Sequence, residues 1–353
     1  MKQSKEVTIY DIAQKLHISS ATVSRGLNNH FSVNKKTQKI IIETARAMGY
    51  RSNLFAKNLR HQKTRTLGVI VQTLNSNFIA SVLSGIEQVA NEAGYNLIIS
   101  QSQESQAKEV MNADAMFNRR VDGLIVSLAF DTKEISHFDS FFNKDIPVVF
   151  FDRVPPGPSS TNVVIDNFKA GYEATRHLVS QGCKRIAHIT GNLTRNVYAD
   201  RMKGYKEALQ ESNIPFNEKY VVINNMDEAS ALEASRRLLA MKPMPDALFV
   251  ANDNCAAVCM QAIKDAGYSV PKDIAVVGFN NDIISRLVNP KITTVNYPAE
   301  EVGTIAANAL VNHLEGKNNL GSTSTIIIKS ELIIRESSLK KSTPAKKRKA
   351  IAN

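Results

Sequence analysis

The segment at residues 20–28 carries side chains suited to contact with nucleic acid. Its sequence, SATVSRGLN, places small or polar side chains on one side of a helix, together with one arginine. Small residues let a helix approach the DNA major groove closely, and an arginine can donate two hydrogen bonds to guanine O6 and N7. We therefore predict direct DNA contacts from Ser20, Ala21, Ser24, Arg25 and Asn28. An ordinary helical hairpin with a solvated face remains the alternative.

Two short helices joined by a tight turn are expected to position this segment. Thr8 and Asp11 give the first helix a start that resembles a capping box, and its apolar residues recur at helical spacing up to Leu16. Ser19 can cap the second helix, in which Val23 is an apolar position. The pattern predicts a helical hairpin with one apolar face.

A third helix is predicted from Lys35 or Lys36 to Met48, with Asn34 as its cap. Its apolar positions can close a small core with the first two helices. Its basic side chains and Thr37 can meet phosphates, which fix the register of a protein on DNA without carrying sequence information.

The charge of the chain is strongly uneven. The 353 residues carry a net charge of +11, and residues 1–65 alone hold 13 Lys and Arg against 3 Asp and Glu. The tail at 337–353 adds six basic residues and no acid, so the middle of the chain is acidic. A basic head on an acidic body is typical of a nucleic-acid-binding protein, because neutralised phosphates release counterions.

Several other classes of protein are disfavoured. No glycine-rich phosphate loop follows any predicted strand, and no Ser/His/Asp set or metal-ligand pattern occurs, so we expect neither an enzyme, a cofactor nor a metal site. Cys183, Cys255 and Cys259 are a sparse, odd set, typical of reduced thiols; the last two are expected to be buried apolar residues on a helix. The absence of a signal-peptide core and of any membrane-length apolar run favours a cytoplasmic protein without membrane contact.

Two motifs, TIYDIA at 8–13 and SxxTVSR at 19–25, resemble the headpiece of the LacI/GalR transcriptional regulators. The resemblance extends from about Val7 to about Glu336. It implies operator DNA of near-palindromic sequence and a small-molecule effector as partners, and a homodimer as the working form. With the hinge described next, the predicted DNA-contact set comprises Thr8, Ser19, Ser20, Ala21, Ser24, Arg25, Asn28, Thr37, Tyr50, Asn53, Ala56 and Leu59.

By the same resemblance, residues 49–60 form a hinge helix that folds on the operator and enters the minor groove. Leu59 falls where the family places a leucine wedged into the central base step, and Asn53 and Ala56 fall at other groove-facing positions. Such a wedge costs a few kcal/mol of unstacking, which contacts allowed by the bend offset. Ser52 replaces the usual proline, and serine can still cap a helix. Packing of Leu54 and Leu59 between domains is the alternative.

From Leu67 onward, short apolar runs alternate with amphipathic segments, one of them at about 133–143. Strand–helix repetition at this spacing implies parallel sheets covered on both faces, and the length suits two sheets. The resemblance implies an α/β, two-lobe, periplasmic-binding-protein-like core of two doubly wound parallel sheets.

The expected domain boundaries follow from this two-lobe arrangement. They are a helix-turn-helix headpiece at 1–50, a hinge helix and linker at 51–64, a core at 65–336 and a basic tail at 337–353. Lobe 1 would comprise about 65–165 and 294–322, and lobe 2 about 166–293 and 323–336, so that 326–328 would lie in lobe 2. The tail has no leucine heptad; it is expected to be disordered, with added phosphate contact as an alternative.

Ligands of open α/β sheets bind at the carboxyl ends of strands. Polar groups follow several predicted strands there, and the resemblance assigns an effector site to Phe78, Asp152, Arg201, Asn252, Asn280 and Tyr297. Their amide, carboxylate and guanidinium groups suit a sugar or another small polar molecule. A loop cap or turn stabiliser is the alternative role for each.

Two positions depart from the family's sugar-binding pattern, since Asn280 replaces an aspartate and Tyr297 replaces a glutamine seen in some members. With Arg153 and Arg195 nearby, an anionic ligand such as a sugar acid or a sugar phosphate is a hypothesis. The sequence as a whole predicts a DNA-binding transcriptional regulator, in the first place a repressor, controlled by a small polar ligand. The alternatives are a solute-binding receptor without a DNA role, or a regulator that needs a corepressor or protein partner.

Overall fold

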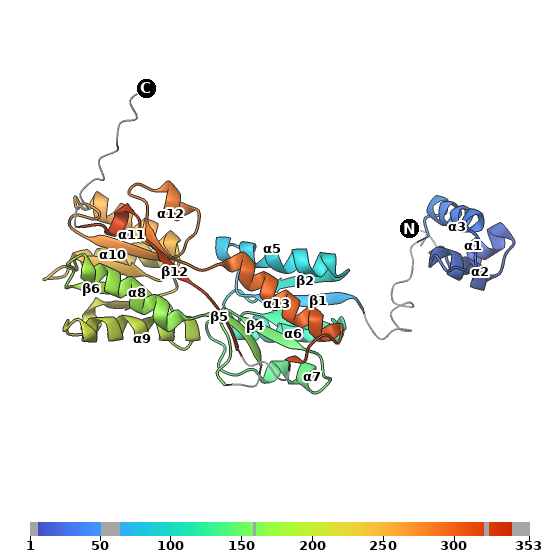
Figure 1. Cartoon of the computed structure of the whole chain (residues 1–353), viewed down its shortest axis with the longest axis horizontal. Coiled ribbons are helices and arrows are strands. Elements are labelled where there is room, and N and C mark those ends of the chain that lie inside the picture. Colours follow the sequence, from blue (N-terminus) through green and yellow to red (C-terminus); the bar gives the residue numbers. More distant parts are fainter. Residues whose placement is uncertain (1–5, 51–63, 158–159, 321–324, 341–353) are drawn as a thin grey trace, which may run out of the picture. The chain divides into compact units, whose positions relative to one another are not determined.

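The computed structural model describes residues 6–50, 64–157, 160–320 and 325–340. The chain divides into two compact units, Met1–Thr64 and Arg65–Asn353. We call the first the headpiece and the second the core, and each is described by itself (Figure 1). No helix in the described ranges is long and apolar enough to cross a membrane.

The headpiece contains three helices, α1 (Ile9–Leu16), α2 (Ser20–Leu27) and α3 (Lys35–Ala47). Each begins at the predicted cap: the side chains of Thr8, Ser19 and Asn34 accept hydrogen bonds from the third following residue's backbone N–H. The predicted capping box of α1 is complete, because the Asp11 carboxylate accepts the Thr8 N–H at 2.7 Å. The helices enclose a small core formed by Ile12, Ala13, Val23, Val33, Ile41 and Ala45.

Gly26 lets α3 approach α2 closely. A Cβ at this position would lie 2.5 Å from the Ile41 Cδ1 atom at the centre of the headpiece core. A larger residue would force the Ile41 side chain to move within this core, so glycine at position 26 lets α2 pack closely on α3.

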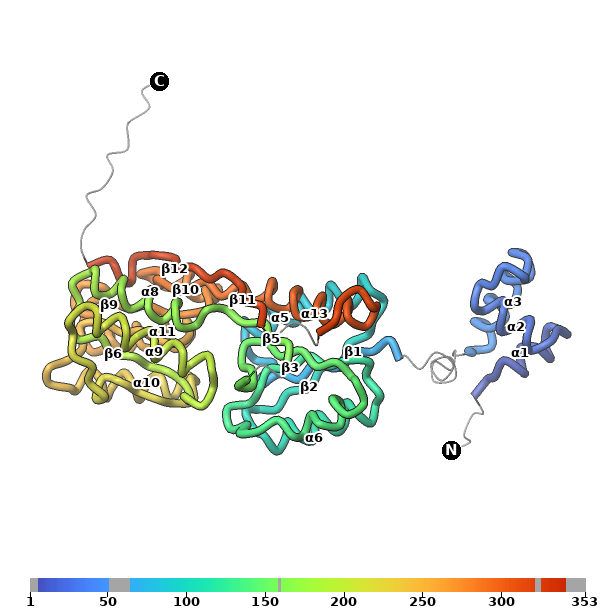
Figure 2. Tube along the Cα trace, turned by 60° about the horizontal axis from the view of Figure 1, so that its bottom comes forward, coloured from blue at the N-terminus to red at the C-terminus, as the bar shows by residue number. Residues whose placement is uncertain are grey.

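The first lobe of the core contains a six-stranded sheet whose strands are all parallel. Its order is β11-β5-β4-β3-β1-β2, where β1 is Thr66–Val71, β2 Asn96–Gln101, β3 Gly123–Val126, β4 Val148–Phe151, β5 Thr161–Ile165 and β11 Thr325–Ile328. Figure 2 shows helices on both sides of this sheet: α5 (Asn77–Glu92) and α13 (Ala299–Leu314) on one side, α6 (Gln106–Asn118) on the other.

The second lobe repeats this plan with the sheet order β12-β10-β9-β8-β6-β7. Its strands are β6 Ile186–Thr190, β7 Val221–Ile223, β8 Ala247–Val250, β9 Ala275–Asn280, β10 Thr293–Asn296 and β12 Glu331–Ile333. Four of its helices pack in two pairs, each against a different apolar core. The first pair is α8 (Asn167–Ser180) with α9 (Asn196–Glu211), and the second is α10 (Glu228–Leu239) with α11 (Asp253–Asp265). The prediction of two doubly wound sheets is confirmed, except that β12 runs antiparallel to β10.

Two of the predicted lobe boundaries and the extent of one predicted helix are wrong. Strand β11 pairs with β5, so residues 325–328 belong to lobe 1, and the chain returns to lobe 2 only between Ile328 and Glu331. Strand β10 pairs with β9, so lobe 2 extends to Asn296 rather than to 293. The helix expected at 133–143 is reduced to a 3₁₀ turn at Ser136–Phe138 and one short helix, α7 (Asp139–Phe142).

The start of the predicted tail belongs to lobe 2. A 3₁₀ turn at Glu336–Ser338 buries Ser337 and Ser338 completely. The Ser337 hydroxyl donates to the Val276 carbonyl at 2.6 Å and accepts from the Thr293 N–H at 2.9 Å. Residues 341–353 lie outside the described residues. The prediction of buried cysteines at 255 and 259 is confirmed, with 2% and 0% exposure.

The helix pair α8 and α9 crosses at two glycines. A Cβ on Gly171 would lie 2.8 Å from the Arg201 Cα, and a Cβ on Gly204 would lie 2.6 Å from the Tyr172 nitrogen. The backbones of the two helices therefore touch, which no larger residue would allow. This close crossing fixes the position of Arg201, one of the residues expected to bind an effector.

Candidate functional site

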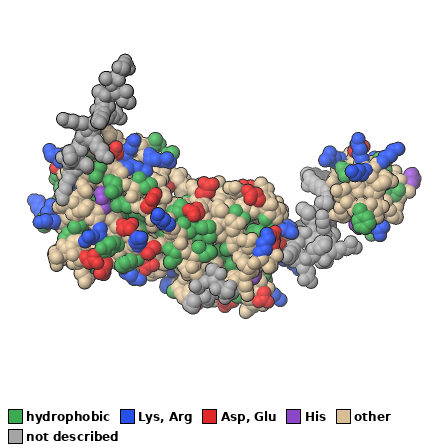
Figure 3. Space-filling view, viewed as in Figure 1, with side chains coloured by type: hydrophobic (Ala, Val, Ile, Leu, Met, Phe, Trp, Pro, Cys, Tyr) green, Lys and Arg blue, Asp and Glu red, His purple; other side chains and the backbone are tan. Residues whose placement is uncertain are grey.

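The outer face of α2 presents the predicted DNA contacts. Ala21, Arg25 and Asn28 are exposed, and Ser20 and Ser24 are partly exposed. The Asn28 amide nitrogen also donates to the Ser24 carbonyl at 2.8 Å, where it helps to end the helix. Figure 3 shows Lys and Arg side chains on the headpiece surface, where they can meet phosphates.

The other predicted DNA-contact residues differ in their burial and in their hydrogen bonds within the headpiece. Ser19 and Thr8 act as helix caps, and the Thr8 hydroxyl also donates to the Asp11 carboxylate at 2.7 Å. Thr37 and Tyr50 are half-buried, and the Tyr50 N–H donates to the Ala45 carbonyl just beyond α3. Three hinge positions lie outside the described residues: Asn53, Ala56 and Leu59.

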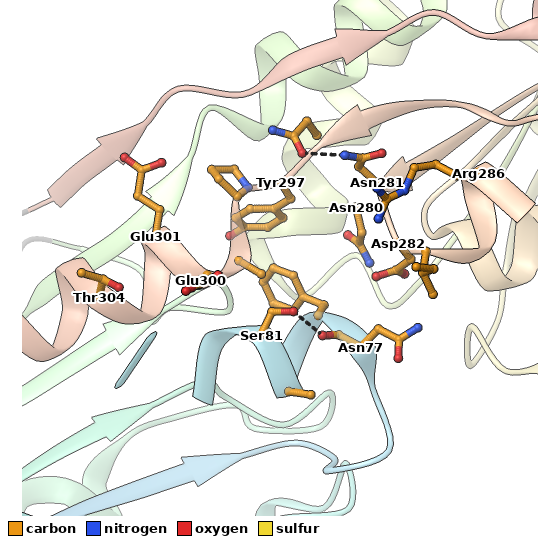
Figure 4. A pocket seen from close by; sticks show the side chains of 16 residues that line it. Asn77, Ser81, Asn280, Asn281, Asp282, Arg286, Tyr297, Glu300, Glu301 and Thr304 are labelled. Atoms are coloured by element: carbon orange, nitrogen blue, oxygen red, sulfur yellow. Dashed lines mark hydrogen bonds between the residues drawn. The ribbon is translucent and has the colours of Figure 1, made fainter. Parts of the chain in front are cut away.

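The carboxyl ends of both sheets point into the space between the lobes, and the predicted effector residues lie along it. Phe78, Asn280 and Tyr297 line a cavity of about 800 Å³ at the edge of this cleft (Figure 4). Its walls come from the start of α5 and α13 in lobe 1 and from the loop after β9 in lobe 2. Asp152, Arg201 and Asn252 are not among the residues that line this cavity.

Asp152 and Arg201 lie deeper and are almost completely buried, at 6% and 3% exposure. Arg201 donates from Nε to the Asn167 side-chain oxygen at 2.9 Å and from Nη1 to the Ala251 carbonyl at 3.2 Å. Its guanidinium lies 3.5 Å from the centre of the Phe279 ring. Arg201 is thus held by protein groups on several sides.

Burial dominates the electrostatics of Asp152. It raises the pKa of the carboxyl, while the positive charges of Arg153 and Arg201 act against this shift. The residue also has a left-handed backbone, with φ of 55°. A strained, buried carboxyl beside two guanidinium groups is the kind of arrangement found at ligand sites.

Asn252 and Asn280 have structural roles in this conformation. The Asn252 side-chain oxygen accepts the Cys255 N–H at 2.7 Å and so caps α11, and its amide donates to the Met226 carbonyl at 3.3 Å. Asn280 has a φ of 100° at the end of β9, and its side chain acts to lower the pKa of the Asp282 carboxyl, which burial raises. A cap and a turn stabiliser, the simpler roles considered from the sequence, are therefore present.

Glu104 is a site residue that the sequence analysis missed. Its carboxylate accepts from Arg153 Nη1 at 2.7 and 2.9 Å, and the Arg153 guanidinium lies 4.1 Å from the centre of the Phe130 ring. Arg153 Nη2 also donates to the Tyr198 hydroxyl at 3.3 Å. Because Glu104 already neutralises Arg153, the charge available for an anionic ligand is smaller than the sequence suggested. Glu104 follows β2, so the rule that selected the other residues could have found it.

Further hydrogen bonds join the two lobes on the same side. The Asn196 side chain donates to the Asp152 carbonyl at 2.9 Å and accepts the Val154 N–H at 3.0 Å. The Asn192 amide donates to the Phe130 carbonyl at 3.0 Å, and Arg195 Nη2 donates to the Thr132 carbonyl. The lobes therefore contact each other through the chain's own polar groups.

Comparison with known proteins identifies this combination of headpiece and two-lobe core. Residues 8–53 match the family described as bacterial regulatory proteins, lacI family, and residues 175–338 match the periplasmic binding protein-like domain. Catabolite control protein A of Priestia megaterium is 35% identical over 309 residues, which is 87% of this chain and 92% of that protein. The chain belongs to the LacI family of transcriptional regulators.

Solved structures agree with this assignment. The lac repressor dimer bound to operator and an anti-inducer aligns with a TM-score of 0.84 at 24% identity, over 95% of this chain and 100% of that one. The transcriptional regulator CelR in complex with cellobiose aligns with a TM-score of 0.72 at 25% identity, over 94% and 100%. The family consists of DNA-binding regulators rather than enzymes, as the sequence predicted.

Proposed function

We propose that this LacI-family protein is a dimeric repressor that binds a near-palindromic operator and responds to a small polar ligand in the interlobe cleft. One observation carries the DNA part of the proposal. Helix α2 is capped at Ser19, packed on α3 through Gly26, and presents Arg25 outward beside small side chains. A rigid helix with an exposed arginine and a shallow surface can enter the major groove.

Dimerisation is supported by the logic of half-sites and by the core surface. Two headpieces are needed to read a two-fold symmetric operator. Three large apolar side chains near β2, the edge strand of the first sheet, are exposed: Leu74 at 47%, Ile99 at 42% and Met111 at 70%. Covering them with a second copy would remove apolar surface from water. The lac repressor, which shares this fold, is a dimer on its operator.

The ligand part rests on unsatisfied polar groups in the cleft. Gln72 Oε1, Ser127 Oγ and Thr190 Oγ1 are buried at the carboxyl ends of β1, β3 and β6, and none has a hydrogen-bond partner among the described residues. Buried polar groups need partners, and a hydroxylated ligand could supply them. CelR, a regulator of the same fold, binds cellobiose. A sugar or sugar derivative is thus the ligand class we favour.

Control of DNA binding would follow from a shift between lobe arrangements. A ligand that binds one arrangement more tightly changes the population of both, and operator affinity changes by that difference in binding free energy. Whether the ligand releases the repressor or acts as a corepressor depends on which arrangement it favours.

Selection of genomic DNA fragments by the purified full-length protein, without added ligand, tests the DNA part. We expect enrichment of fragments that share a near-palindromic site. Fragments without any common motif, recovered by a folded protein, would contradict it. Repeating the selection with candidate sugars would then show whether a ligand releases or promotes binding.

A further inference from the structure

The interlobe cleft contains an aromatic ring supplied by the chain itself. Tyr297 follows β10 directly, where the chain crosses from lobe 2 to lobe 1, and only 2% of it is exposed. Its ring centre lies 4.6 Å from that of Phe78 in lobe 1 and 6.4 Å from that of Phe279 in lobe 2. The phenol is thus packed between aromatic walls that come from both lobes.

The polar end of this ring faces the buried charges. The Tyr297 hydroxyl is buried and has no hydrogen-bond partner among the described residues, and the charges of the Asp152 carboxyl and the Arg201 guanidinium act on it. Burial next to Asp152 raises the pKa of the Tyr297 phenol, which therefore stays protonated. An apolar ring on aromatic walls, with its hydroxyl directed at a carboxylate, is how a hydroxylated ring-shaped ligand would be held.

The groups around Tyr297 are also engaged within the chain. Arg201 is held by Asn167, the Ala251 carbonyl and the Phe279 ring, and Arg153 is paired with Glu104. Phe78 and Tyr297 also line the cavity of about 800 Å³ at the edge of the cleft (Figure 4). The charged groups around Tyr297 are therefore bound by the chain's own side chains and carbonyls.

We propose that Tyr297 is a built-in occupant of the interlobe cleft, whose phenol takes the place beside Asp152 that an effector would otherwise fill. This inference deepens the proposed function, because it concerns what occupies the same cleft. It means that an effector must displace the Tyr297 side chain. Such a molecule should resemble the phenol it replaces: a ring with an apolar face and a hydroxyl at the Asp152 end.

Chemical complementation tests this inference. In Tyr297→Ala, the missing side chain should leave a cavity between Phe78 and Phe279, and the melting temperature of the core should fall by about 10 °C. The probe is p-cresol, which has the structure of the missing side chain; toluene, which lacks the hydroxyl, is its control. Apolar cavities bind small aromatic molecules. We expect millimolar p-cresol to raise the melting temperature of the variant but not of the wild type, and to bind about tenfold more tightly than toluene.

Hydrogen exchange gives a second measurement that a purely local packing role would not change. Amide exchange in residues 128–132 and 192–198, where the lobes hydrogen-bond to each other, should become faster in Tyr297→Ala and slow again with p-cresol. If the alanine variant does not fold, Tyr297→Gln can replace it with the same expected exchange. Tyr297→Phe, which keeps the ring and lacks the hydroxyl, should melt only a few degrees below the wild type and should bind neither probe.

Several results would overturn the inference. One is a folded variant whose melting temperature and exchange do not respond to p-cresol, and another is an equal response in the wild type. Neither measurement uses DNA. If the protein selects no operator but p-cresol stabilises Tyr297→Ala, the proposed function alone is contradicted. If the protein selects an operator but p-cresol does not stabilise the variant, only the role of Tyr297 is contradicted.

Discussion

Replacing Glu104 by glutamine should destabilise the core, because it leaves the Arg153 guanidinium buried without its carboxylate. The two carboxylate oxygens lie 2.7 and 2.9 Å from Arg153 Nη1, and the exposed fractions of the side chains are 7% for Arg153 and 31% for Glu104. Breaking a fully buried pair costs about 3–5 kcal/mol. Solvent reaches part of Glu104, and Arg153 keeps Tyr198 and Phe130, so we expect about 2 kcal/mol for Glu104→Gln.

Urea unfolding of the core, combined with a double-mutant cycle, measures this quantity. Arg153→Met removes the charge but keeps a long side chain against Phe130. If the pair interacts as the geometry indicates, the double variant should lose about 1–2 kcal/mol less than the sum of the single variants. Glu134→Gln, at an exposed carboxylate of the same lobe, is the matched control and should stay within about 0.5 kcal/mol of the wild type.

The reasoning would be refuted by a Glu104→Gln variant as stable as the control. It would also be refuted by single-variant effects that simply add, since the two side chains would then not be coupled. Thermal melting provides an independent check, with an expected decrease of about 4–8 °C for a loss of 2 kcal/mol.

Three further predictions concern the headpiece and lobe 2. Arg25→Ala should weaken binding to a selected operator by about 1–3 kcal/mol and relax preference at one base pair per half-site, measured by binding to a set of operator variants. Gly171→Ala should destabilise the core by about 1–3 kcal/mol in urea, because its Cβ would lie 2.8 Å from the Arg201 Cα. Burial raises the pKa of Asp253 to about 8, from 3.8 in the unfolded chain, so its contribution to stability is complete below pH 3.8 and is lost as pH rises to about 8. The free energy of unfolding of Asp253→Asn, relative to that of the wild type, should therefore rise by a few kcal/mol between pH 5 and pH 8, as measured by urea unfolding.

Each of these predictions has a clear opposite outcome. An unchanged base preference would remove Arg25 from direct readout. A Gly171→Ala variant of wild-type stability would mean that α8 and α9 can separate without cost. A constant stability difference between wild type and Asp253→Asn across this pH range would show that the carboxyl titrates alike in folded and unfolded chains.

The headpiece was predictable because its signals are local. Thr8, Ser19 and Asn34 are cap residues that act within three positions of themselves, and the apolar spacing between them defines the three helices. The succession of strands and helices in the core was predictable for the same reason. A buried parallel strand appears in the sequence as a short apolar run, whatever sheet it later joins.

The pairing of the last strands was not predictable in this way. Residues 325–328 and 331–333 are two similar apolar runs separated by two residues, yet one joins β5 in lobe 1 and the other joins β10 in lobe 2. The choice depends on partners more than 30 residues away along the chain. Local pattern carries no information about it.

The cleft shows the same limit at the level of side chains. The family resemblance named Asp152, Arg201 and Tyr297 as candidates; Tyr297 lines the cavity, and Asp152 and Arg201 are buried. The sequence did not indicate that Glu104 neutralises Arg153, or that Tyr297 packs between two phenylalanines. Both facts depend on which side chains the folded lobes bring together.

The central claim is that two headpieces of one dimer read two half-sites through α2. Measuring the affinity of the full-length protein for a selected site, and for the same DNA with one half-site scrambled, tests it most directly. Each mismatched base pair costs about 1–3 kcal/mol, so scrambling one half should reduce binding to nearly the level of random DNA. Equal affinity for the intact and the half-scrambled site would contradict the claim.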